Sequence, residues 1–152
     1  MNQPVKQPLR SLLFAACIGA TGLAAAAAAA DEAKPMALRG VMQQLGRDMQ
    51  AVTGAISQED WALVARLAPQ IARHAEPPLS EKMRILAWLG ADASKFRGFD
   101  EQVHQAAQAM GAAAQRGDGQ AVIESFAKVQ QGCLACHQSF RKSFQEHFYE
   151  KR

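Results

Sequence analysis

Cysteine is scarce in this chain of 152 residues, which contains only Cys17, Cys133 and Cys136. Cys17 lies in an alanine-rich N-terminal segment that we expect to be removed, so the mature chain keeps two cysteines in one short motif. One such pair cannot build a disulfide framework, and without a second pair it lacks the ligands of a structural zinc site. Apolar and polar residues nowhere alternate over a useful length, which favours an all-α fold.

An excess of charge of one sign is also missing. The full sequence has 17 basic and 14 acidic residues, a formal net charge of +3. Without Lys6 and Arg10 the 17 basic residues become 15, against the same 14 acidic ones, so the mature chain carries about +1. A chain this close to neutral gives no indication of nucleic-acid binding.

Residues 1–30 have the pattern of a secretory signal peptide. Lys6 and Arg10 precede an apolar run that reaches Ala30 and ends in small residues before Asp31. The run is mostly alanine and lacks the bulk and flanking anchors of a stable membrane span, and the residues before Cys17 fit a lipoprotein cleavage site poorly. We predict a signal peptide over residues 1–30, a mature domain over 31–152, export to the periplasm and no permanent membrane span.

The mature chain has the apolar spacing of four long helices. The first, over residues 34–56, carries a heptad stripe of Leu38, Met42, Leu45, Met49, Val52 and Ile56. The second follows Ser57 as N-cap, has His74 on its apolar face and stops before Pro77. A short helix over 81–89, capped by Ser80 and ended by Gly90, precedes a third long helix that reaches Arg116. The fourth starts at Asp118 and runs toward Phe148. Short connections between such helices predict an antiparallel four-helix bundle.

The most specific feature is Cys133-Leu134-Ala135-Cys136-His137, inside the fourth helix. On a helix Cys136 and His137 lie within about 60° of Cys133, so both thiols and the imidazole address one flat ligand. Cys-x-x-Cys-His is the attachment sequence of a c-type haem, in which both thiols form thioethers and the histidine binds iron. A thiol redox pair is the competing interpretation. We predict one covalent haem c on Cys133 and Cys136, with His137 as proximal iron ligand.

With this motif the chain resembles the class II c-type cytochromes, the cytochrome c′ and cytochrome c556 group. Phe140-Arg141 match the aromatic residue and arginine that follow the histidine in this family. Asp92-Ala93-Ser94-Lys95-Phe96 resembles the opening of its third helix, and Gly117-Asp118 resembles the turn before its fourth. The resemblance covers essentially the whole mature chain. It implies a four-helix bundle with haem near the C-terminal end of the last helix.

The resemblance also implies two further residues at the haem. The stretch 41–46 matches the family's first helix and places Met42 where the family sets the residue that faces the distal side of the iron. Arg141, one turn beyond His137, is implied in the proximal pocket. Arg39 falls one residue short of the family's usual arginine spacing, and residues 143–152 extend past the family's usual end.

The expected function is that of a periplasmic monohaem electron carrier, which alternates between ferric and ferrous iron, meets redox proteins of the periplasm and is not an enzyme. One alternative is a gas-binding cytochrome c′ whose iron is five-coordinate and takes nitric oxide or carbon monoxide. A haem-free thiol redox protein is another. The oligomeric state stays open, and a homodimer is compatible with the pattern.

The remaining candidates have ordinary structural explanations. His74 and His147 are expected at a helix end and in a charged tail, whereas His104 lies nearer an inward face and is the alternative distal ligand. Aromatic side chains such as Trp88 and Phe140 are expected to pack rather than to relay electrons. The other helical methionines are expected not to bind the iron: Met36, Met49 and Met110.

Overall fold

In the computed structural model of the protein, residues 36–150 are described. The predicted signal peptide over residues 1–30 lies outside this range. Within it the chain is helical nearly throughout and contains no strand. None of the helices in residues 36–150 is long and apolar enough to cross a membrane.

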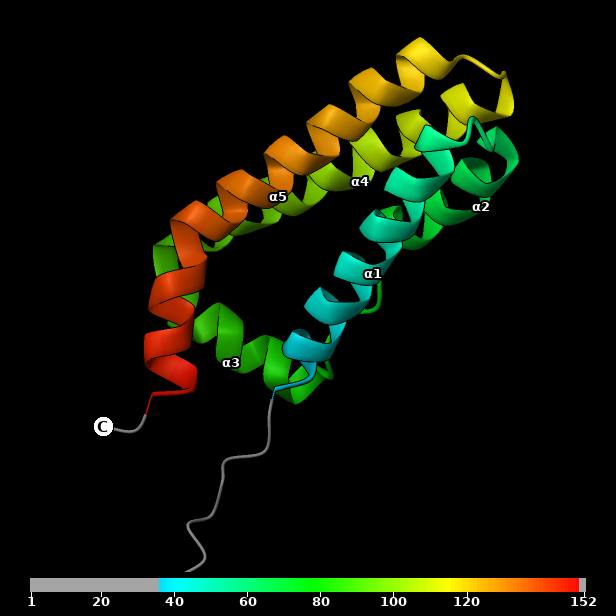
Figure 1. Ribbon diagram of the computed structural model, residues 1–152. Coiled ribbons are helices and arrows are strands. Elements are labelled where there is room, and N and C mark those ends of the chain that lie inside the picture. Colours follow the sequence, from blue (N-terminus) through cyan, green and yellow to red (C-terminus); the bar gives the residue numbers. More distant parts are fainter. Residues whose placement is uncertain (1–35, 151–152) are drawn as a thin grey trace, which may run out of the picture. The chain divides into compact units, whose positions relative to one another are not determined.

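Five α-helices follow one another in this part of the chain (Figure 1). They are α1 (Ala37–Ser57), α2 (Trp61–Ala72), α3 (Leu79–Leu89), α4 (Ala93–Gln115) and α5 (Gly119–Phe148), with a 3-10 turn (Gly90–Asp92) between α3 and α4. The helices α1, α2, α4 and α5 form the bundle, and α3 is the short helix that the sequence predicts before the third long one. The all-α, four-helix prediction is confirmed.

Two of the bundle helices begin at aspartate caps. The Asp118 carboxylate accepts a hydrogen bond from the Ala121 amide at 3.1 Å, as predicted for the start of α5. At α2 the prediction of Ser57 as N-cap is wrong. The cap is Asp60, which accepts from the Leu63 amide at 2.9 Å. Ser57 belongs to α1, where its hydroxyl donates to the Thr53 carbonyl at 2.9 Å, so its side chain is already satisfied.

The predicted borders around α3 are only partly correct. α2 ends at Ala72, so His74 lies in the connection and not on the helix. α3 begins at Leu79, directly after Pro78, and Ser80 does not cap it. Gly90 ends α3 as predicted, with a positive φ of 52° that glycine adopts at little cost.

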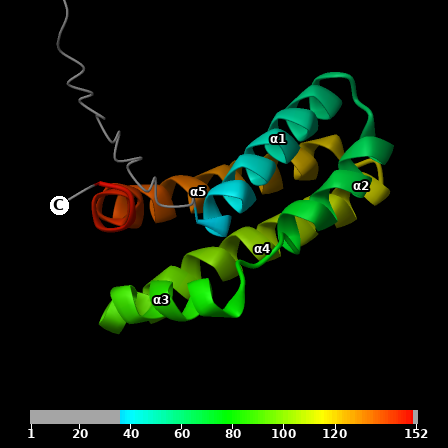
Figure 2. The same ribbon diagram turned by 90° about the horizontal axis from the view of Figure 1, so that it is seen from below.

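Each bundle helix packs against the helix that runs antiparallel to it. The most extensive contacts join α4 to α5, α2 to α4 and α1 to α2, whereas α1 and α5 touch at few points. Figure 2 shows α1 and α2 side by side, joined by their short turn. The bundle is therefore held mainly through α2 and α4, and α1 is tied to α5 indirectly.

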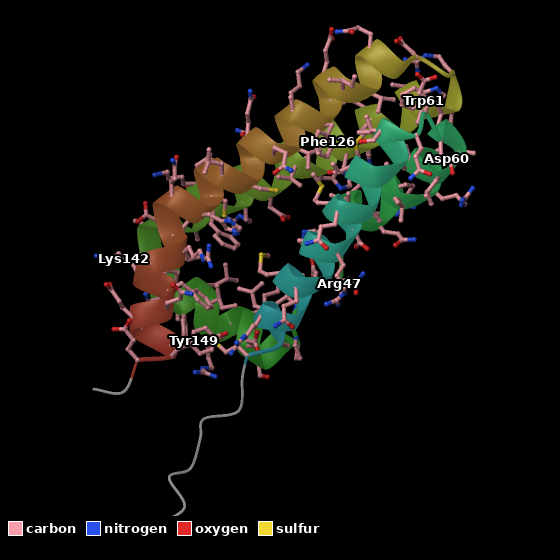
Figure 3. All side chains as sticks on the ribbon, viewed as in Figure 1. Arg47, Asp60, Trp61, Phe126, Lys142 and Tyr149 are labelled. Carbon is pink, nitrogen blue, oxygen red and sulfur yellow. The ribbon has the colours of Figure 1, made fainter. Side chains whose placement is uncertain are left out.

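The apolar residues form two separate clusters. The larger, here called the bundle core, lies between α1, α2, α4 and α5 and contains Val52, Val64, Ile71, Met110 and Val129, each almost fully buried. Trp61 and Phe126 flank it, and Figure 3 shows both toward the end of the bundle where α4 connects to α5. The smaller, here called the end cluster, joins the start of α1 to α3, the start of α4 and the end of α5; its buried members are Met36, Ile85, Leu89 and Phe140.

The heptad stripe predicted for α1 faces the interior at every position except Met42: Val52 is fully buried, and the others, Leu38, Leu45, Met49 and Ile56, are partly buried against the two clusters. The buried residues are Val41, Asp48, Val52 and Ala55, and Met42 is 40% exposed. The most buried positions are thus shifted slightly from the stripe, because Val41, Asp48 and Ala55 each precede a stripe residue by one position. The expectation that Met42 occupies a packed core position is therefore wrong.

Candidate haem site

The Cys-x-x-Cys-His motif lies on α5 at the level where the two clusters meet. Cys133 packs against the bundle core, and Cys136 packs against the end cluster. Gly132, just before the motif, is buried against α4, where a Cβ atom would come within 2.7 Å of Val103 Cγ2. The close approach of α4 and α5 thus fixes the motif's position on the bundle.

Both motif cysteines are free thiols of intermediate burial. Burial raises the pKa of the Cys133 thiol. For Cys136, burial together with the charges of Cys133 and Asp100 raises the pKa to about 11. Both groups are therefore protonated at neutral pH. A catalytic thiol pair needs the opposite shift, toward a stable thiolate, so this environment argues against the thiol redox interpretation.

His137 follows the two thiols on the exposed edge of α5. Desolvation of the ring, helped by the positive charge of Arg141, lowers the pKa of His137. The imidazole is therefore neutral at pH 7, which is the form that binds a metal. Arg141 lies close enough to influence His137, as expected for a residue one helical turn away.

On α1, Met42 lies at the level where the side chains of the helix change from the end cluster to the bundle core. On α1, Leu38 belongs to the end cluster while Leu45 and Met49 belong to the bundle core. Met42, between them in sequence, is exposed. α1 thus passes from one cluster to the other at Met42, and α5 does so between Cys133 and Cys136. Sequence spacing alone did not reveal this correspondence.

The other histidines are engaged elsewhere. His104, the alternative distal ligand, donates from Nδ1 to the Ala72 carbonyl at 2.6 Å and meets Gln108 Nε2 with its Nε2 at 2.7 Å. It therefore joins α4 to the end of α2. His147 stacks on Trp88 with a centroid distance of 6.0 Å.

His74, in the connection that follows α2, forms a pair with Asp100 of α4. Its Nε2 lies 3.0 Å from Asp100 Oδ1, and its Nδ1 lies 3.1 Å from the Ala75 carbonyl. Because both ring nitrogens face acceptors, the charged imidazolium is favoured. The hydrogen bond that His74 donates to the Asp100 carboxylate accordingly raises the pKa of His74 and lowers that of Asp100.

The methionines predicted not to bind iron have packing roles. Met110 is fully buried in the bundle core, and Met36 is 6% exposed in the end cluster. Met49 is partly buried against the bundle core.

Aromatic side chains surround the C-terminal side of the motif. Phe140 is 8% exposed and meets Phe96 and Phe99 edge to face, at centroid distances of 5.5 and 6.3 Å. Lys95 Nζ lies 5.7 Å from the centre of the Phe140 ring, a cation–π contact. Trp88 packs edge to face on Phe144 at 5.5 Å. Trp88 and Phe140 therefore pack, as the sequence predicts.

The residues present fit a c-type haem. Two protonated thiols and a neutral imidazole lie within five consecutive residues of one helix, which is the donor set that covalent attachment and axial ligation require. Apolar residues of both clusters adjoin the thiols and suit a large flat apolar group. The sequence alone does not predict two supports of this region, Gly132 against α4 and Glu81 at the start of α1.

A four-helix bundle with Cys-x-x-Cys-His in its last helix is the arrangement of a class II c-type cytochrome. The family described as Cytochrome C′ matches this chain over residues 37–141, from the start of α1 to Arg141. The chain therefore belongs to the cytochrome c′ family, and this membership implies a covalently bound c-type haem. No curated protein matches the chain.

Proposed function

We propose that this protein is a monohaem one-electron carrier, with haem attached through Cys133 and Cys136 and with His137 and Met42 as the axial ligands of the iron. The haem iron, when bound, supplies the site that gains and loses one electron. Cytochrome c′ family members are haem-binding carriers or ligand-binding proteins, and accordingly we assign no enzymatic reaction.

The position of Met42 is the observation that supports a carrier over a gas binder. Its side chain is 40% exposed and is not a buried or partly buried member of either cluster, so the sulfur is accessible to act as a ligand. A thioether paired with histidine stabilises ferrous iron and completes a six-coordinate centre. Such a centre changes little between its two redox states, which favours electron transfer.

His137 and its neighbourhood are suited to the proximal role. The lowered pKa keeps the imidazole unprotonated and available at neutral pH. Arg141 adds a positive charge on the same helix, one turn away. A cation near the iron favours the ferrous over the ferric charge state, so Arg141 raises the reduction potential.

We further propose that the signal-like segment directs export to the periplasm, where the protein exchanges electrons with other redox proteins. Its basic start and small-residue end support this proposal. The mass of the mature chain tests it, because export predicts loss of about the first 30 residues. A purified protein that keeps residues 1–25 would contradict the proposal.

Optical spectra of the ferric and ferrous protein, with and without carbon monoxide, test the ligand assignment. We expect low-spin ferric iron with the weak methionine-to-iron band at the red end of the visible spectrum. Met42→Ala should abolish this band, produce high-spin iron and allow carbon monoxide to bind. Met83→Ala is the matched control, because Met83 is also exposed, at 57%, but lies on α3.

A different set of three results would support the gas-binding alternative. If the wild type is already high-spin, binds carbon monoxide and is unchanged by Met42→Ala, Met42 is not a ligand. The open distal face would then be the functional site, taking nitric oxide or carbon monoxide.

A further inference from the structure

The first turn of α1 is closed by a residue from a different helix. The first amides of any α-helix have no partner within that helix. At α1 the N-cap Met36 supplies no side-chain acceptor, and the first turn contains no acidic residue. Instead, the Glu81 carboxylate of α3 accepts from the Ala37 amide through Oε2 and from the Leu38 amide through Oε1, both at 2.7 Å. This two-point, charge-assisted contact also places a negative charge at the positive end of the α1 dipole.

α3 is in turn fastened to the end of α5. Ile85 and Leu89 are buried in the end cluster together with Phe140 of α5. Trp88 packs on Phe144 and Phe148, at centroid distances of 5.5 and 5.7 Å. Figure 1 shows α3 between the start of α1 and the end of α5. α3 therefore links the start of α1 to the end of α5 through the Glu81 hydrogen bonds and the Trp88 ring contacts.

Met42 lies within the segment of α1 that this link holds. It lies five positions after Ala37, about 7.5 Å along the helix axis. The bundle core holds α1 beyond Met42, from Leu45 onward, and Glu81 holds it before Met42. Met42 itself is 40% exposed, so its position follows that of α1, which is held near it by the Glu81 contact, by Leu38 in the end cluster and by Leu45 in the bundle core.

We propose that Glu81 is a positioning residue, which clamps the first turn of α1 to α3 and thereby sets the distance between Met42 and the iron held by His137. This inference rests on the proposed function, in which Met42 is the distal ligand. Without the clamp, the first turn of α1 frays, and the Met42 sulfur leaves the iron more readily. The haem would still be attached, because Cys133 and Cys136 lie on α5.

The test compares Glu81→Ala and Glu81→Gln with the wild type as purified ferric holoproteins. An exogenous imidazole titration measures how readily Met42 is displaced, and the methionine-to-iron band reports ligation directly. We expect Glu81→Ala to bind imidazole about tenfold more tightly, because part of the stability lost with its two charge-assisted hydrogen bonds reaches the Met42 ligation. Glu81→Gln keeps one acceptor oxygen and should lie between the two. Glu76→Ala is the control, since Glu76 is a nearby carboxylate whose contact is an exposed ion pair with Lys82 at 2.7 Å.

A Glu81→Ala protein with wild-type helix content, haem content, band intensity and imidazole affinity would overturn the clamp. A wild type that is high-spin and lacks the band would instead overturn Met42 ligation. In that case the carbon monoxide association rate of Glu81→Ala, compared with that of the wild type, tests the clamp independently of Met42 ligation. A changed rate supports positioning of α1 at the distal face, and a rate equal to that of the wild type and of Glu76→Ala rejects it.

Discussion

Gly132 of α5 lies against Val103 of α4 so closely that a Cβ atom on Gly132 would be 2.7 Å from Val103 Cγ2. Valine in a helix has one strongly preferred χ1 rotamer and cannot easily turn aside. Any side chain at position 132 would therefore push the helices apart immediately before Cys133. The glycine allows the attachment segment to lie directly on the bundle.

We predict that Gly132→Ala lowers the free energy of unfolding by about 1–2 kcal/mol, because the overpacking cost exceeds the gain of about 1 kcal/mol in helix propensity. Urea unfolding monitored by circular dichroism measures the effect. Gly46→Ala is the control, because Gly46 lies in α1 and a Cβ atom added there would meet no neighbouring group within 4 Å. It should stabilise the protein by about 0.5–1 kcal/mol.

Adding Val103→Ala to Gly132→Ala should recover part of the lost stability, because it removes the group that the new methyl meets. The two substitutions are thus expected to be non-additive. Equal or higher stability of Gly132→Ala alone would show that α4 and α5 separate without cost.

The His74–Asp100 pair predicts a particular pH dependence of stability. The pKa of His74 is raised above 6.5, so its contribution is fully present below pH 6.5 and is lost as pH rises through the folded pKa. The pKa of Asp100 is lowered below 3.8, so its contribution is present above pH 3.8 and is lost as pH falls through the folded pKa. The pair therefore stabilises most between these two values.

Unfolding free energies of the wild type and Asp100→Asn, measured from pH 4 to 9, test this expectation. The difference should be greatest near pH 5 and shrink above pH 7. It should stay below about 1 kcal/mol, because the Asp100 side chain is 58% exposed and solvent screens the pair. Glu124→Gln, on the exposed side of α5, is the control and should show no such window. A difference that grows toward alkaline pH would contradict the assignment.

Sequence spacing predicted the features that depend on residues close together in the chain. Three of these features are the N-cap Asp118, the helix end at Gly90 and the order of the thiols and the imidazole on one helix. Ser57 failed as a cap because its hydroxyl found the Thr53 carbonyl within α1, leaving Asp60 to cap α2. Local sequence does not indicate which of two neighbouring polar residues accepts the hydrogen bond from the first amides of a helix.

Features that join distant parts of the chain could not be predicted in this way. The heptad stripe correctly indicates a helix and its inward side, but not that Met42 is exposed where α1 passes from one cluster to the other. The Glu81 cap joins residues more than 40 positions apart. The fit of Gly132 against Val103 depends on the approach of two helices. Each of these contacts is visible only after the helices are assembled.

Trp88 is predicted to hold the extension of α5 beyond Arg141. It contacts Phe144, His147 and Phe148, all in the part of α5 that follows the family match. Trp88→Ala should lower the unfolding free energy by about 2 kcal/mol, less than the 3–5 kcal/mol typical of a fully buried tryptophan because Trp88 is only half-buried.

Chemical unfolding monitored by far-ultraviolet circular dichroism measures this loss. Leu79→Ala on the same helix is the control, since Leu79 is 74% exposed and should change stability by less than about 0.5 kcal/mol. If both substitutions have the same small effect, the aromatic contacts do not hold α3 to α5.

The last prediction concerns the covalent attachment on which the haem assignment depends. Extraction of the holoprotein with acidified acetone should leave the haem on the wild-type polypeptide, because thioether bonds survive denaturation. Cys133→Ser or Cys136→Ser should retain haem less completely through the one remaining thioether, and the double variant should lose it. Leu134→Ala is the matched control, because Leu134 lies between the two cysteines, is 57% exposed and carries neither a thiol nor an imidazole. The raised pKa values of Cys133 and Cys136 keep both thiols protonated, which slows their oxidation to a disulfide before attachment. Complete extraction of haem from the wild type would reject covalent attachment, and with it the assignment of Cys133 and Cys136.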